Sequence, residues 1–191
     1  MTPCLANTPV ITTERLVLRA PVAGDWPHFN AMLASDRARF LRTAGYDLAQ
    51  TWRSFGHMIG HWVLRGFGMF VWQAKGDETP LGLTGPWFPE TWPEREIGWS
   101  VWNPAAEGKG HAYEAARAAR AYAYGELGWQ TAVSYVHPMN LRSRRLAERL
   151  GAMPDRQAST MGDCLAYRHP APDACEAGAV HLCQIDEGTP G

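Results

Sequence analysis

The junction between residues 97 and 127 constrains the fold of this chain more than any other feature. An apolar run up to Trp102 leads through Asn103-Pro104 and the turn Gly108-Lys109-Gly110 into a segment with alanines at helical spacing. This order is typical of a strand that turns through glycines into a helix beginning at His111. The first N–H groups of a helix have no partner within it, so the junction favours binding of an anion such as a diphosphate.

Two common phosphate-binding patterns do not fit this junction. A P-loop needs Ser or Thr after its Gly-Lys pair, but Lys109 is followed by Gly110. The dinucleotide fingerprint needs a further glycine at position 113, which is Tyr113 here, and an acidic residue about 20 positions downstream. A Gly-X-Gly by itself also serves ordinary tight turns, so the rest of the chain must decide what the junction binds.

Apolar periodicity predicts one α/β domain with a mixed, mainly antiparallel sheet flanked by helices. We expect this domain to cover residues 1–170, followed by a loosely ordered tail, 171–191, that is rich in Pro, Gly and acidic residues. Strands are predicted at 13–19, 69–74, 81–87, 96–102, 129–136, 153–158 and 164–168. Helices are predicted after Asp25, at about 48–64, at 111 to about 127, and after the N-cap Asn140 up to Leu150.

Composition argues against several classes of protein. Eighteen Lys and Arg against nineteen Asp and Glu give a net charge of -1, which provides no global field for nucleic acid or an anionic membrane. No apolar run of about 18 residues occurs, and the start of the chain is unlike a targeting peptide, so we expect a cytoplasmic protein. The widely separated cysteines favour a reduced compartment over a disulfide framework, and no metal site is predicted. They are Cys4, Cys164, Cys175 and Cys183.

Four stretches of the chain carry a family pattern. They are Thr13-Glu14-Arg15-Leu16-Val17-Leu18-Arg19, Glu96-Ile97-Gly98-Trp99 with Asn103-Pro104, Glu107-Gly108-Lys109-Gly110-His111-Ala112-Tyr113-Glu114-Ala115, and residues 140–152, which begin Asn140-Leu141-Arg142-Ser143. In order and spacing, over about residues 12–169, they resemble the GCN5-related N-acetyltransferases (GNAT). The resemblance is greatest to the branch of ribosomal-protein N-terminal acetyltransferases of the RimJ/RimL type.

This resemblance implies acetyl-CoA as co-substrate, with the pyrophosphate on the backbone N–H groups of residues 108–112. The pantetheine arm would pair with the strand before the loop and touch the Asn140 helix from the other side. Three positions depart from the family pattern: Ala105 replaces Gln or Arg, His111 replaces a Tyr of the branch, and Ala147 replaces a Tyr that protonates the leaving thiolate. The residues that the resemblance assigns to the cofactor are Trp99, Val101, Glu107, Gly108, Lys109, Gly110, His111, Ala112, Asn140 and Ser143.

Acetyl transfer to an amine requires a base, because an alkyl amine with a pKa of about 10.4 is protonated at pH 7. Glu96, on the strand leading to the loop, is the candidate base; the alternative is a solvent-facing partner of Arg95. Ser143 is the candidate hydrogen-bond donor to the thiolate, unless it bonds back to its own helix. Tyr135 is a reserve proton donor whose alternative role is packing. Direct attack needs no enzyme nucleophile.

Two further groups favour ordinary surface roles. His57 and His61 share a predicted helix face, but no third ligand accompanies them, so a partly exposed helix face is favoured over a metal site. The family resemblance implies that this helix borders the acceptor site. The basic residues of the last predicted helix favour a solvated face, with one arginine reaching the 3′-phosphate of CoA. They are Arg142, Arg144, Arg145 and Arg149.

The sequence therefore predicts an acetyl-CoA-dependent N-acetyltransferase acting on a primary amine, either a protein N-terminus or a small molecule. Because of Ala105 and Ala147, a CoA-binding or regulatory module of the same fold is the alternative. No nucleic acid or membrane partner is expected, and a homodimer is compatible with the sequence.

Overall fold

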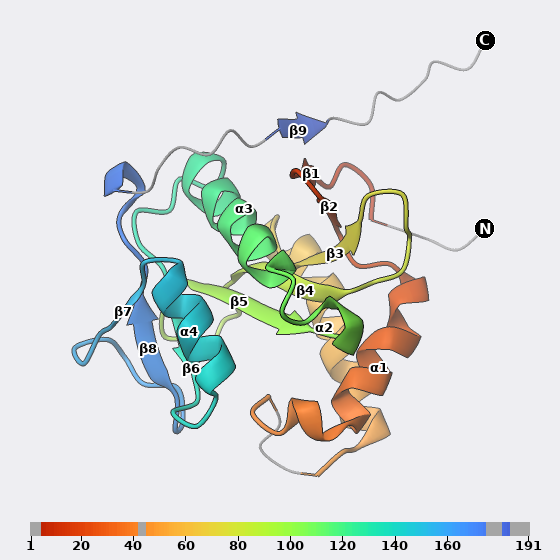
Figure 1. Ribbon diagram of the computed structural model, residues 1–191, viewed down its shortest axis with the longest axis horizontal. Helices are drawn as coiled ribbons and strands as arrows, with labels where there is room; N and C mark the ends of the chain where they lie inside the picture. The colour runs from red at the N-terminus through yellow and green to blue at the C-terminus, as the bar shows by residue number, and fades with distance from the viewer. Residues whose placement is uncertain (1–4, 42–44, 175–180, 184–191) are drawn as a thin grey trace.

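The computed structural model describes residues 5–41, 45–174 and 181–183, and its centre is a nine-stranded mixed sheet (Figure 1). The strand order is β7-β8-β6-β5-β4-β3-β2-β1-β9, and every neighbouring pair is antiparallel except β5 and β6. The predicted mixed, mainly antiparallel sheet is confirmed. The strands are β1 Val10–Thr12, β2 Leu16–Arg19, β3 Phe70–Ala74, β4 Gly82–Trp87, β5 Glu96–Val101, β6 Val133–Val136, β7 Met153–Pro154, β8 Leu165–Arg168 and β9 His181–Cys183.

Helices cover both faces of this sheet. Figure 1 shows α3 and α4 in front of the sheet and α2 behind it. Among the described residues, no helix is long and apolar enough to span a membrane. The α-helices are α1 Trp26–Ala34, α2 Leu48–Arg65, α3 His111–Gly125 and α4 Leu141–Arg149, and the 3-10 turns are η1 Ala23–Asp25, η2 Asp36–Ala38, η3 Pro104–Ala106 and η4 Pro172–Ala174.

Strand alternation divides the core between the two faces. On β3, Phe70 and Trp72 are fully buried in a cluster that contains Ala115 of α3. Between them, Val71 points the other way, into a cluster that contains Phe29 of α1 and Phe55 of α2. The sheet is therefore sandwiched between two apolar layers.

Strands β5 and β6 pair at one point only. Glu96 lies opposite Val133, and the Val133 N–H donates to the carbonyl of Arg95 at 2.9 Å. At the next position the Ser134 side chain replaces the backbone, because its hydroxyl donates to the carbonyl of Ile97 at 2.6 Å. Beyond Ile97, no backbone hydrogen bond joins these two strands in the described part of the chain, so β5 continues to its end paired with β4 alone.

Several boundaries differ from the sequence prediction. Strand β1 was not predicted, because its three residues are too short to show a period of two. The predicted strand 129–136 is a strand only from Val133, because the Trp129 N–H instead donates to the carbonyl of Ala123 at the end of α3. The predicted strand 153–158 forms only the two-residue β7. Within 171–191, the segment expected to be a loose tail, the described residues include η4 and β9; Cys4 and Cys175 lie outside the described residues.

Candidate functional site

Between β5 and α3 the chain makes two consecutive turns. Asn103 caps η3, because its Oδ1 accepts the Ala105 N–H at 2.9 Å, while the Ala105 side chain is exposed. Gly108 and Gly110 then adopt φ values of 73° and 79°, a left-handed conformation that side chains other than glycine seldom adopt. These glycines allow the chain to enter α3 directly after β5.

The turn leaves a row of backbone donors at the start of α3. The first backbone bond of this helix joins the Glu114 N–H to the carbonyl of Gly110 at 3.1 Å. The six N–H groups of residues 108–113 find no acceptor within the described residues. Together with the positive end of the helix dipole, these donors form a site that fits the diphosphate of a nucleotide.

Arg15, in the turn between β1 and β2, links this turn to the loop before α3 through hydrogen bonds. Its Nη1 donates to the carbonyl of Lys109 at 2.9 Å, and its Nε donates to Glu114 Oε2 at 2.7 Å. Thr13 Oγ1 donates to the other oxygen of Glu114 at 2.6 Å. Burial raises the pKa of Glu114, but the hydrogen bonds from Thr13 and Arg15 outweigh burial and lower this pKa overall. The loop therefore carries a fixed guanidinium on one side.

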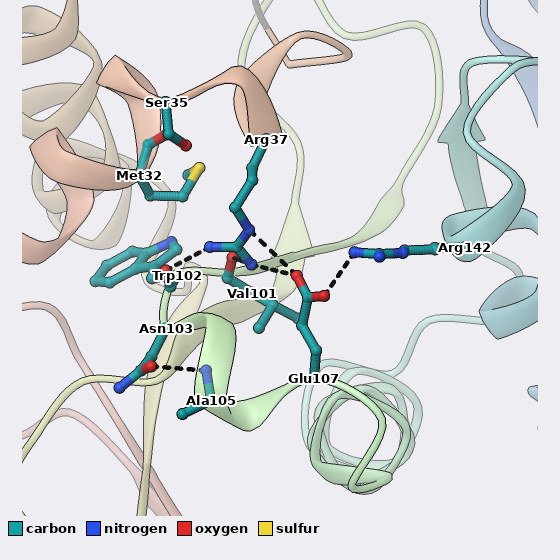
Figure 2. Close-up of polar contacts among 9 residues, drawn as sticks. All are labelled: Met32, Ser35, Arg37, Val101, Trp102, Asn103, Ala105, Glu107 and Arg142. Carbon is teal, nitrogen blue, oxygen red and sulfur yellow. Dashed lines mark hydrogen bonds and ion pairs between the residues drawn. The ribbon is translucent and has the colours of Figure 1, made fainter.

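On the other side of the loop, Glu107 lies between two arginines (Figure 2). Its Oε1 accepts from Nη2 of Arg37 at 2.5 Å, and its Oε2 accepts from Nη1 of Arg142 at 2.5 Å. Arg37 comes from η2 and Arg142 from α4, so the carboxylate links elements of the two faces of the sheet. This acidic side chain beside the donor row is thereby neutralised, and the cluster keeps one net positive charge.

Arg37 is a site residue that sequence reasoning missed. Its guanidinium also donates to the carbonyl of Trp102 at 2.7 Å and to the carbonyl of Val101 at 3.0 Å. The resemblance assigned the Val101 backbone to the pantetheine arm, but in the structure its carbonyl is engaged by Arg37. No motif surrounds Arg37, so only its tertiary contacts reveal it.

Glu96 lies at the start of β5, where this strand meets β6. Its Oε2 accepts from the Trp92 indole N–H at 2.6 Å, and its Oε1 accepts from the Tyr135 backbone N–H at 3.4 Å. Burial raises the pKa of Glu96 to about 7, although both hydrogen bonds act in the opposite direction. The alternative of a solvent-facing partner for Arg95 is wrong, because Glu96 is buried and the Arg95 guanidinium lies over the Trp129 ring.

Tyr135 lies near Glu96 rather than near Ser143. Strand alternation sends Tyr135 away from Val136, which packs in the cluster that contains Ala147 of α4. The Tyr135 hydroxyl is buried and has no hydrogen-bond partner in the described part of the molecule. Burial, followed by the charges of Glu94 and Glu96, raises its pKa to about 12.

Ser143 and Asn140 lie at the start of α4, across the divergence from β5. The Oδ1 of Asn140 accepts the Ser143 N–H at 3.2 Å, so this asparagine caps the helix. The Ser143 hydroxyl accepts the indole N–H of Trp99 at 3.3 Å and makes no bond back to its own helix. Ala147 is fully buried one turn further along. The structure therefore brings Trp99, Asn140 and Ser143 together, on the face of β5 opposite Glu96.

The other candidates lie at or beyond the edges of this site. His111 begins α3; burial and then the charge of Arg15 lower the pKa of its imidazole, whose Nδ1 is buried without a partner among the described residues. Of the helix α4 arginines, Arg144 donates to the Tyr167 hydroxyl at 2.9 Å and Arg149 lies over the Tyr113 ring, whereas Arg145 is exposed.

The two histidines of α2 do not form a metal site. His61 is buried, its Nε2 accepts the Phe88 N–H at 3.2 Å, and its Nδ1 contacts the carbonyl of Phe67 at 2.7 Å. Both ring nitrogens are therefore in use, while His57 is exposed and packs edge-on against Trp87. A partly exposed histidine face was expected, and for His61 this is wrong. Nowhere in the described residues do three or more His, Cys, Asp or Glu gather as metal ligands.

Comparisons with known proteins agree with this architecture. A family model described as an acetyltransferase (GNAT) domain matches residues 15–153. The crystal structure of an acetyltransferase from Agrobacterium tumefaciens str. C58 is 33% identical, with a TM-score of 0.81 over 89% of this chain and 99% of that one.

More distant structures share the fold. A putative ribosomal-protein-serine acetyltransferase from Vibrio cholerae is 19% identical, with a TM-score of 0.66 over 89% of this chain and 100% of that one. A spermidine N-acetyltransferase from Vibrio cholerae, solved in complex with CoA and spermine, is 15% identical, with a TM-score of 0.66 over 84% of this chain and 98% of that one.

Proposed function

Because this chain belongs to the GNAT acetyltransferase family and is thereby an N-acetyltransferase, we propose that it transfers the acetyl group of acetyl-CoA to a primary amine by direct attack. Both substrates would be bound together, and no acetyl group would pass to the enzyme itself. This mechanism needs three things from the chain: a diphosphate site, a proton acceptor near the amine, and a hydrogen-bond donor near the sulfur.

The observation that carries the proposal is the row of N–H groups at residues 108–113, which have no acceptor among the described residues and follow the end of β5 that is not paired with β6. The left-handed glycines Gly108 and Gly110 leave the loop backbone uncovered by side chains, and Arg15 binds the carbonyl of Lys109 within the loop. A diphosphate on these donors would direct a pantetheine arm between β5 and α4. There the free amide N–H groups of the Asn140 side chain can meet it, since only its Oδ1 is used in capping.

On the amine side, Glu96 is the group that we propose as the base. A carboxyl with a pKa of about 7 is partly ionised at neutral pH and still basic enough to accept the proton that the substrate ammonium group loses before its nitrogen attacks the thioester. Its Oε1 is held by the backbone of β6 and its Oε2 by Trp92, which fixes the carboxylate at the apex of the divergence. The proton can reach it directly or through one water molecule.

On the sulfur side, we propose that the Ser143 hydroxyl stabilises the departing thiolate. Ala147 has no proton to give, whereas Ser143 lies one turn earlier on the same helix and is half-buried. A hydroxyl is too weak an acid to protonate a thiolate fully, but a fixed dipole stabilises the developing charge. Glu96 and Ser143 lie on opposite faces of β5, so attack and departure take place on separate sides of the thioester.

For the acceptor we propose a protein N-terminus or a small amine, in an enzyme of the RimJ/RimL type. The support is the four sequence stretches and the fold shared with the ribosomal-protein-serine acetyltransferase. An α-amino group, with a pKa of about 7.7–8.0, loses its proton more readily than a lysine-like amine, so a base with a pKa near 7 suits it well.

The decisive experiment incubates the protein with acetyl-CoA and a panel of amines while free thiol is recorded. The panel should hold peptides with free N-termini, a polyamine, an aminoglycoside and single amino acids. We expect turnover with at least one class, and no stable acetyl-enzyme in its absence. Background rates with every amine, despite CoA binding by calorimetry, would instead favour the CoA-binding module. Absence of CoA binding would contradict the proposed site itself.

A further inference from the structure

A hydrogen bond between the side chains of Trp99 and Ser143 connects β5 to α4. Trp99 lies on β5 beyond the last contact with β6, and its indole N–H reaches Ser143 Oγ at 3.3 Å. The indole ring also packs against the buried cluster that contains Ala147 and Val136. This hydrogen bond is therefore formed by a side chain that packing holds in place on the sulfur side of the site.

The chemistry of the two groups fixes the direction of this bond. An indole N–H can only donate, so the Ser143 oxygen must be the acceptor, and the proton of the hydroxyl has to point elsewhere. The carbonyl of Asn140, a usual target for a serine in this position, accepts the Arg144 N–H at 3.0 Å, and the Ser143 hydroxyl makes no hydrogen bond to it. No described residue accepts the Ser143 hydroxyl proton.

We infer that Trp99 is a positioning residue that orients the Ser143 hydroxyl toward the sulfur of the leaving group. This inference rests on the proposed function. As the C–N bond forms and the C–S bond breaks, the amine proton passes to Glu96 and the C–S electron pair stays on sulfur. Ser143 keeps its proton and hydrogen-bonds the thiolate, which takes a proton from solvent. The indole strengthens that bond, because a hydroxyl that accepts a hydrogen bond donates a stronger one.

The same contact accounts for Ala147. Ala147 is fully buried in the apolar cluster against which the Trp99 ring packs. A tyrosine there would overlap with the packed indole, because buried cores leave no room for an added ring. The bulky Trp99 and the small Ala147 are thus complementary, and the pair Trp99–Ser143 takes over the hydrogen bond to sulfur.

The test measures the thiol pKa of CoA bound to the protein, which needs no acceptor amine. Thiolate absorbance in the ultraviolet is followed against pH for the wild type, Trp99→Phe and Ser143→Ala. Trp102→Phe is the matched control, because Trp102 directly follows β5 and its indole N–H donates to the hydroxyl of Ser100 on that strand at 3.0 Å. We expect the bound thiol pKa to rise in Trp99→Phe and Ser143→Ala and to stay at the wild-type value in Trp102→Phe.

Kinetics on an active amine give the second readout. We expect Trp99→Phe and Ser143→Ala each to lower kcat about tenfold, with the KM for acetyl-CoA within twofold of wild type. The double variant should be no slower than Ser143→Ala, since both changes remove one hydrogen bond. Ser143→Thr, which keeps the hydroxyl, should retain most of the activity, and Trp99→Tyr replaces Trp99→Phe if the latter does not fold.

Two results would overturn the inference: an unchanged thiol pKa in Trp99→Phe, or effects on kcat that multiply in the double variant. Either can occur in an enzyme that acetylates amines normally. A wild-type protein that binds CoA but acetylates nothing contradicts the proposed function instead, and the thiol titration still reports on Trp99.

Discussion

The indole N–H of Trp92 donates to Oε2 of Glu96 at 2.6 Å, from a loop that lies over the start of β5. This single strong donor does not compensate for the loss of water, and burial still raises the pKa of Glu96 to about 7. The carboxyl is thus held in one orientation while it remains able to exchange a proton near neutral pH. That combination is what a general base for amine acetylation requires.

Replacing this carboxyl tests its role directly. We expect Glu96→Gln to lower kcat at least about a hundredfold, because the amide fills the same space but accepts no proton. Calorimetry should show unchanged CoA affinity. In the wild type, kcat should fall as pH drops through about 7, where Glu96 becomes protonated. The residual kcat of Glu96→Gln should not show this fall. An unchanged pH–rate profile would remove Glu96 from the role.

The left-handed turn before α3 can be tested with a pair of glycine variants. Gly110→Ala places a Cβ at a φ of 79°, 3.5 Å from Nη2 of Arg15, and should cost about 1–2 kcal/mol while it weakens CoA binding. Gly60→Ala lies inside α2 with open space around it and should be neutral or stabilising by about 0.5–1 kcal/mol, with CoA affinity unchanged. Thermal unfolding and calorimetry measure both quantities. Equal CoA affinity in the two variants would contradict the assignment of the loop.

The negative charge of Glu107 lies beside the proposed diphosphate site, between two arginines. Its carboxylate forms ion pairs with Arg37 and Arg142 beside the donor row. Glu107→Gln removes this negative charge, so the net charge beside the proposed diphosphate site becomes more positive by one. We expect the Kd for CoA to fall a few-fold at low salt, and the gain to shrink as ionic strength increases. The effect on dephospho-CoA, compared in parallel, shows whether the 3′-phosphate contributes. Weaker binding would mean that Glu107 acts mainly by holding Arg37.

The buried network at the apex of β5 and β6 supplies a prediction on stability. Arg120 Nη1 contacts His169 Nδ1 at 3.1 Å, so the ring proton lies on Nε2, which faces Ser134 Oγ at 2.9 Å. Burial, with the charge of Arg120, lowers the pKa of His169 to about 3. This imidazole accepts no proton from Ser134, which is therefore not a nucleophile. Ser134→Ala should cost about 1–3 kcal/mol of unfolding free energy, because Ile97 loses its donor.

His169 also gives the network a pH dependence. The unfolded chain binds a proton on this histidine below about pH 6.5, whereas the folded state does so only near pH 3. Its contribution to stability is therefore complete above pH 6.5 and is lost as pH falls toward 3. Between pH 6.5 and 3, the free energy of unfolding measured with denaturant should fall more steeply with decreasing pH in the wild type than in His169→Gln. Parallel plots of this free energy against pH would show that His169 is not neutral in the folded state.

The strand–glycine–helix junction could be predicted from the sequence because every step of it is local. Residues 97–112 contain the apolar run, the glycines at φ above zero and the alanine-rich start of a helix, all within one stretch. The same holds for the Asn140 cap of α4 and for the order of strands β3, β4 and β5, which are neighbours in the chain and in the sheet. Short elements such as β1 carried too few residues to show any period.

The chain alone therefore determined where a diphosphate donor row can form, because backbone conformation follows from nearby residue types. Tertiary structure decided the chemistry around it: that Arg37 engages the Val101 carbonyl, that Trp99 reaches Ser143, and that Glu96 is buried beneath Trp92. Proton affinity and hydrogen-bond direction depend on which distant groups exclude water and which face one another. Those contacts arise only when the sheet brings together segments that lie far apart in sequence.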